Sequence, residues 1–112
     1  MNDRTLLELA AKAAGMVGWR YSGGMGMLKM IDPSRAEDTG SIGPNWNPLT
    51  DDADALRLAV VVQLDIHFYH ERASVWWPDN TDSYDEEYND DPCAATRRAI
   101  VRAAAEIGKG MA

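Results

Sequence analysis

The sequence has few cysteines and no long apolar run. It contains one cysteine, Cys93, which excludes an internal disulfide. Because secreted domains of this size often depend on such bridges, a reducing compartment is favoured. The longest uncharged apolar run, 58–62, is far too short to span a bilayer. The opening segment carries charges where a signal peptide would have an apolar core. We therefore expect a cytoplasmic protein without membrane contact.

Reactive side chains are also scarce, and they do not form a recognisable catalytic set. His67 and His70 lie three residues apart on a predicted strand, so they point to opposite faces. Cys93 is near a predicted helix start, but Asp90 and Asp91 oppose formation of its thiolate. We expect Cys93 to be an ordinary buried or half-buried helix residue. These patterns predict no enzyme activity, no metal site and no cofactor.

Two further patterns match ligand sites only in part. The carboxylates between residues 79 and 91 suit Ca²⁺, but that stretch lacks the central glycine of an EF-hand loop. Gly23, Gly24 and Gly26 lack the lysine of a phosphate-binding loop. A hairpin turn at the first two glycines is the simpler interpretation.

Negative charge is concentrated in one place. The chain has 112 residues, a size that predicts one domain, 1–112, and a net charge of −7. Residues 79–91, called the acidic segment below, contain seven acidic residues and no lysine or arginine. The rest of the chain has eleven acidic and eleven basic residues and is therefore neutral. We interpret the acidic segment as a loop.

Three segments have the signals of helices. Residues 5–14 start at Thr5, with a carboxylate three residues later, which is a capping box. Residues 51–63 follow Thr50, the predicted N-cap, and carry acidic residues in the first turn, as the helix dipole favours. The centre of this helix, 56–62, is apolar on nearly all sides, which predicts that it is well buried. The third helix, 92–107, has Asp91 as its predicted N-cap, a proline in first position and Gly108 as its predicted end.

Two segments predict hairpins. Alternating aromatic and polar residues around position 20 and the Gly23-Gly24 pair indicate a hairpin within residues 16–31. A second hairpin is predicted for 65–70 and 73–77, and residues 32–48 read as a long loop. The order αββαββα predicts an α+β fold, with one mainly antiparallel sheet and helices packed on it.

Two blocks of sequence carry a family resemblance. They are 46–59 (WNPLTDDADALRLA) and 94–107 (AATRRAIVRAAAEI). With the opening Leu-rich helix, they resemble small bacteriophage and prophage proteins grouped as the phage ABA-sandwich domain (NinX-like) family. The order W-N-P-L-T-D-D is the more specific part. The resemblance implies an α/β/α sandwich and a phage-encoded accessory role in the host cytoplasm, with no catalytic residues to carry over.

The acidic segment and the aromatic residues in and beside it form the candidate site. One interpretation is a solvated loop that keeps the protein in solution. The other is a surface that binds a protein with a basic surface, because clustered charge speeds such encounters. The candidate partner-binding residues are Trp76, Trp77, Asp79, Asp82, Tyr84, Asp85, Glu86, Glu87, Tyr88, Asp90 and Asp91.

These residues predict a non-catalytic module that binds a host or phage protein. An inhibitor of a host defence protein is one specific form of this hypothesis. Direct nucleic-acid binding is not expected, because the chain has no basic excess, and Arg97, Arg98 and Arg102 read as a solvated helix face. The alternative is a homo-oligomer that self-associates through an exposed apolar face or sheet edge.

Overall fold

The computed structural model describes residues 2–15, 19–22, 27–30 and 45–111. Its helices are α1 (Asp3–Ala13), α3 (Asp52–Val62) and α4 (Pro92–Lys109). One antiparallel sheet has the order β1 (Trp19–Ser22), β2 (Met27–Met30), β3 (Asn45–Trp46). A second antiparallel sheet has the order β4 (Asp65–Phe68), β5 (Arg72–Trp76), β6 (Ser83–Glu87).

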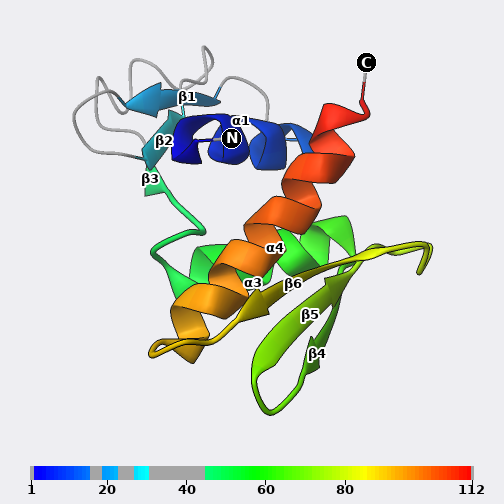
Figure 1. The fold of residues 1–112 in the computed structure, drawn as a ribbon. Coiled ribbons are helices and arrows are strands. Elements are labelled where there is room, and N and C mark those ends of the chain that lie inside the picture. Colours follow the sequence, from blue (N-terminus) through cyan, green and yellow to red (C-terminus); the bar gives the residue numbers. More distant parts are fainter. Residues whose placement is uncertain (1, 16–18, 23–26, 31–44, 112) are drawn as a thin grey trace.

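The described helices lie between the two sheets (Figure 1). α1 packs across α4 and contacts β1 and β2, while α4 contacts α3, β5 and β6. The predicted α+β class, with helices packed on an antiparallel sheet, is confirmed. The number of sheets and the layer order differ from the prediction. Two three-stranded sheets replace one four-stranded sheet, and helices form the middle layers rather than the outer ones.

Two strands were not predicted, and each has a physical reason. β3 is only two residues long, inside the predicted loop 32–48, and it exists because it pairs with β2. β6 lies in the acidic segment, where aspartate and glutamate disfavour strands in isolation. Both predicted hairpins are present as β1–β2 and β4–β5, although residues 23–26 lie outside the described residues.

The N-caps of α1 and α3 are displaced from the predicted residues. Asn2 caps α1 by accepting a hydrogen bond from the Thr5 N–H at 2.8 Å, so Thr5 lies inside the helix. Asp51 caps α3, and its Oδ1 accepts from the Asp54 N–H at 2.9 Å. Each cap is a side chain that satisfies a free N–H of the first turn, and a carboxylate also suits the helix dipole.

α4 begins as predicted and ends later. Asp91 accepts from the Ala94 N–H at 3.0 Å, and Pro92 occupies the first turn. The helix continues past Gly108 to Lys109. Gly108 is buried against α1, so it marks a close contact between helices and not the helix end.

The core is built from small and branched apolar side chains where the helices meet. Trp46, which precedes the start of α3, is buried in it. No described helix combines the length and hydropathy that a membrane crossing requires. The buried apolar residues are Leu6, Leu7, Ala10, Ala11, Trp46, Ala55, Leu58, Ala59, Ala73, Val75, Ala95, Ala99, Ile100, Val101, Ala103, Ala104 and Ala105.

Candidate protein-binding surface

The middle of the acidic segment is a strand, so its interpretation as a loop is wrong. β6 pairs with β5 over its whole length, from Trp76 opposite Ser83 to Arg72 opposite Glu87. Turns bound the strand on both sides. Asn80 and Asn89 adopt positive φ values of 59° and 53° there, a conformation that asparagine tolerates better than most residues.

The pleat of β6 divides the candidate residues between two faces of the sheet. Tyr84 and Glu86 face α4, because they lie opposite Val75 and Ala73, which are both fully buried. The Arg102 guanidinium of α4 lies 3.1 Å from the Glu86 carboxylate and 5.8 Å from the Tyr84 ring centre. These two side chains therefore stabilise the packing of the last helix on the sheet.

The opposite face, called the outer face below, carries the other half of the strand residues. Asp85 accepts hydrogen bonds from the Ser74 hydroxyl at 2.6 Å and the Ser83 hydroxyl at 3.3 Å. Arg72 lies 3.7 Å from Asp85. The outer face consists of Asp65, His67, Arg72, Ser74, Trp76, Ser83, Asp85 and Glu87.

The two tryptophans of the candidate site also separate. The Trp77 indole N–H donates to the Ala103 carbonyl of α4 at 3.2 Å, which orients this side chain toward the helices. The Trp76 side chain points to the opposite face of the sheet, because adjacent strand residues alternate, and it lies half-buried on the outer face. Only Trp76 is placed to contact a partner beside the exposed carboxylates.

The remaining acidic residues lie in the two turns. Asp79 accepts hydrogen bonds from the Thr81 hydroxyl at 2.7 Å and the Thr81 N–H at 3.1 Å, which lower the pKa of this carboxyl. Asp82 accepts from the Ser83 N–H at 2.8 Å. Asp91 is used as the N-cap of α4, while Tyr88 is half-buried in the turn before it.

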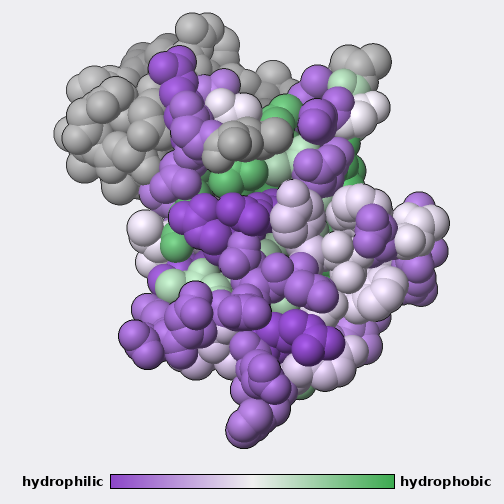
Figure 2. Space-filling view, viewed as in Figure 1, coloured by the Kyte–Doolittle hydropathy of each residue, from purple (hydrophilic) through white to green (hydrophobic). Residues whose placement is uncertain are grey.

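Two carboxylates of the acidic segment have no side-chain partner in the part of the chain that the structure describes. Glu87 and Asp90 are exposed and make no side-chain hydrogen bond or ion pair with the described residues. Both lie at the C-terminal end of β6, and the exposed Asp79 and Asp82 carry negative charge before its start. The ion pairs with Arg72 and Arg102 reduce the charge in the middle. Figure 2 shows hydrophilic residues over most of the surface formed by α4 and β6.

The arginines of α4 are not a solvated face as predicted. Arg97 pairs with Asp52, Arg98 with Asp3 and Arg102 with Glu86. Each arginine contacts a different element, so together they link α4 to α3, α1 and β6. The sequence contains no local signal for these pairs, because their partners lie far away along the chain.

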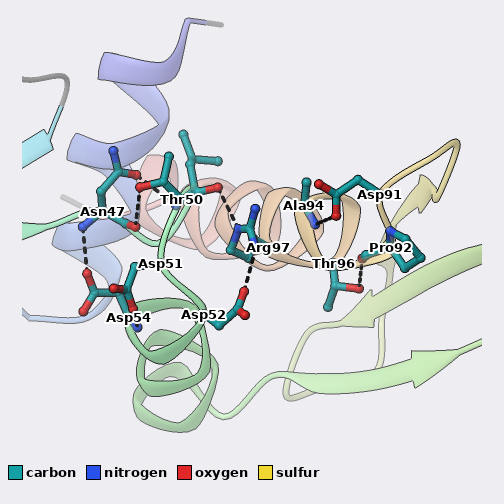
Figure 3. A network of polar contacts seen from close by, with 11 residues as sticks. Asn47, Thr50, Asp51, Asp52, Asp54, Asp91, Pro92, Ala94, Thr96 and Arg97 are labelled. Atoms are coloured by element: carbon teal, nitrogen blue, oxygen red, sulfur yellow. Dashed lines mark hydrogen bonds and ion pairs between the residues drawn. The ribbon is translucent and has the colours of Figure 1, made fainter.

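The specific W-N-P-L-T-D-D block has a structural role at the start of α3 (Figure 3). The Asn47 N–H donates to Asp54 Oδ2 at 2.9 Å, and Asn47 Oδ1 accepts from the Leu49 N–H at 3.0 Å. Arg97 donates to the Leu49 carbonyl at 2.9 Å and to Asp52 Oδ1 at 2.6 Å. These bonds fix the turn that precedes α3 against α4.

An apolar groove between α3, β4 and the start of α4 was not predicted. The apolar run of α3 suggested a buried helix, yet Leu56, Val60 and Val61 are 60–67% exposed. One hollow of about 330 Å³ lies between α3, Phe68 and the first turns of α4. A second, open hollow of about 500 Å³ continues along α3 past Leu64, and the two share Leu56 and Ile66.

The other candidate reactive groups are dispersed. His67 lies 3.1 Å from Asp65 on the exposed outer face, while His70 lies in the turn after β4. Cys93 is exposed and lines the groove, so its expected burial is wrong, because the second residue of α4 faces outward there. No three His, Cys, Asp or Glu side chains converge as metal ligands within the described ranges. Gly23, Gly24 and Gly26 lie outside those ranges.

Comparisons with known proteins assign no family and no function to this chain. No protein-family model matches the chain, and no match was found among curated proteins or solved structures.

Proposed function

We propose that this chain is a non-catalytic binding module that engages a protein with a basic surface. The observation that carries the proposal is the outer face, where Asp85, Glu87 and Trp76 lie on one side of a sheet whose other side is packed on α4. Exposed carboxylates steer a basic partner toward the surface, and an accessible indole supplies contact area.

The binding surface is smaller than the acidic segment. Trp77, Tyr84 and Glu86 are excluded from it, because they contact α4. Asp82 in one turn and Asp90 in the other extend it beyond the strand. A partner would therefore contact β6 from its outer side and touch both turns.

A salt-dependent binding experiment with matched variants tests this surface. The probe is a fluorescent lysine-rich peptide, followed by anisotropy at low and high salt. Combining Asp82→Asn, Glu87→Gln and Asp90→Asn should weaken binding by about tenfold at low salt and by less at high salt. Glu86→Gln alone should have little effect, because this carboxylate faces Arg102.

Equal weakening by Glu87→Gln and Glu86→Gln as single changes would contradict the proposal. Both remove one charge from neighbouring positions of β6, but Glu86 faces α4 and pairs with Arg102, whereas Glu87 lies on the outer face. The same variants can then be used in pull-downs from a bacterial lysate, in which the partner is identified by mass spectrometry.

We also propose a phage-encoded accessory role in the host cytoplasm. Its support is the resemblance of residues 46–59 and 94–107 to the phage ABA-sandwich family, together with the lone exposed Cys93. An exposed free thiol suits a reducing compartment. Inhibition of a host defence protein is one form that this role would take.

A further inference from the structure

The second sheet has a free edge at β4. Its strand order is β4-β5-β6, so among the strands that the structure describes β4 pairs with β5 alone. The Tyr69 N–H donates to the Arg72 carbonyl across the hairpin at 2.9 Å. Because backbone groups alternate along an antiparallel strand, those of Ile66 and Phe68 point to the unpaired side. This edge can therefore accept another strand.

The residues of this edge are complementary to themselves. Residues 64–68 read Leu-Asp-Ile-His-Phe, so Ile66 is at the centre. Asp65 and His67 flank it, and an apolar residue lies at each end. Antiparallel pairing about Ile66 would place Asp65 opposite His67 of the second copy, on the outer face. It would place Leu64 opposite Phe68 of the second copy, on the inner face.

We propose that two copies of this chain pair through β4, with a two-fold axis at Ile66, to form a continuous six-stranded sheet. Ile66 would exchange two backbone hydrogen bonds with its counterpart. Each Phe68 N–H would donate to the Leu64 carbonyl of the other copy. The proposal concerns the opposite edge of the sheet from the acidic β6 and does not rest on the proposed function.

Charge distinguishes this edge from the other free edge of the sheet. β6 carries Asp85, Glu86 and Glu87 in succession, so two β6 strands would repel each other. β4 carries one acidic residue and one histidine, already 3.1 Å apart within the chain. A two-fold axis at His67 would instead place the two histidines opposite each other and leave Asp65 without a complementary group.

Apolar surface favours the same pairing. Phe68 is 68% exposed, although its side chain lies on the inner face of the sheet, where α4 packs. In the paired arrangement it would lie next to Leu64 of the second copy, beside the open hollow of about 500 Å³. That hollow is lined by Leu56 and Val60, which are 60% and 67% exposed. Pairing would thus remove apolar surface of both copies from water.

Sedimentation of two complementary variants tests the pairing directly. Asp65→Lys places lysine opposite His67 of an identical copy, and His67→Glu places glutamate opposite Asp65. Each variant alone should have a dimer dissociation constant about tenfold weaker than that of the wild type. An equimolar mixture should form the heterodimer, because one cross-strand pair is then lysine with glutamate and the other is the wild-type aspartate with histidine. Effects within one chain cannot produce this rescue.

Cysteine cross-linking tests the register in a Cys93→Ser background. Ile66→Cys should form an intersubunit disulfide under mild oxidation, because a hydrogen-bonded pair has a Cα separation of about 5.5 Å. His67→Cys should cross-link less. Glu87→Gln, on the other edge, should leave the dimer unchanged.

The proposal is overturned by any of three outcomes. One is wild-type protein that sediments as a monomer up to about 1 mM. Another is a mixture of the two charge variants that behaves as the sum of its parts. The third is cross-linking through residue 67 in preference to residue 66. None of these outcomes affects peptide binding at the outer face, so the two proposals fail separately.

Discussion

Gly108 illustrates how one residue sets the distance between two helices. It lies inside α4, and a Cβ added there would be 1.9 Å from the Leu9 carbonyl oxygen of α1. Glycine near the end of a helical pattern usually marks the C-cap, which is why it was expected to end α4. Its actual role is to allow backbone contact between α1 and α4.

Gly108→Ala should therefore destabilise the protein, although alanine normally favours a helix interior over glycine. The α1 backbone would have to move, and we expect the free energy of unfolding to fall by about 1–3 kcal/mol. Urea denaturation measures this change. Gly110→Ala is the matched control, because the nearest atom to its added Cβ is 3.6 Å away. An unchanged midpoint for Gly108→Ala would show that the helices are not in such close contact.

At the scale of elements, β6 is a strand because of its neighbour. Its five residues include three carboxylates, a composition that is depleted in strands. Pairing with β5 and burial of Tyr84 against α4 outweigh this low propensity. The pleat then determines which acidic side chains face α4 and which lie on the outer face.

The end of α3 is strained at Gln63, which adopts a left-handed conformation with φ of 64°. Glycine occupies this conformation without a steric penalty from Cβ. Gln63→Gly should raise the free energy of unfolding by about 1 kcal/mol. Gln63→Ala removes the same polar group but keeps Cβ, so it should give no gain. A larger gain from alanine than from glycine in thermal or urea unfolding would contradict this explanation.

At the scale of the whole molecule, Arg97 connects segments that are far apart along the chain. Its guanidinium bonds the Leu49 carbonyl and Asp52, which lie 48 and 45 residues away. Because it is the least exposed arginine of the described ion pairs, with 17% of its side chain accessible, solvent screens it least.

Arg97→Met should lower the free energy of unfolding by about 2 kcal/mol, because the Leu49 carbonyl and Asp52 lose their donor. Arg57→Met on α3 is the control. Arg57 is exposed and makes no side-chain bond with the described residues, so we expect a change within about 0.5 kcal/mol. Chemical denaturation of both variants decides whether this connection contributes to stability. Equal stability of the two variants would contradict the assigned role of Arg97.

The positions of the three helices, the two hairpins and the concentration of negative charge were predictable from the sequence. Caps, apolar periodicity and turn residues act over a few positions, so their signals are local. The cap of α4 at Asp91 is such a case, because its hydrogen bond reaches only to Ala94. The exact caps of α1 and α3 shifted, because several polar residues adjoin each start.

Tertiary structure alone decided which side each candidate residue faces. Glu86 and Glu87 are adjacent and chemically alike, yet Glu86 pairs with Arg102 while Glu87 is exposed and makes no side-chain bond with the described residues. Strand pairing sets this difference, and pairing depends on contacts between distant segments. Contacts between distant segments also decide the groove beside α3. An apolar residue of this helix is buried only where another element packs against it.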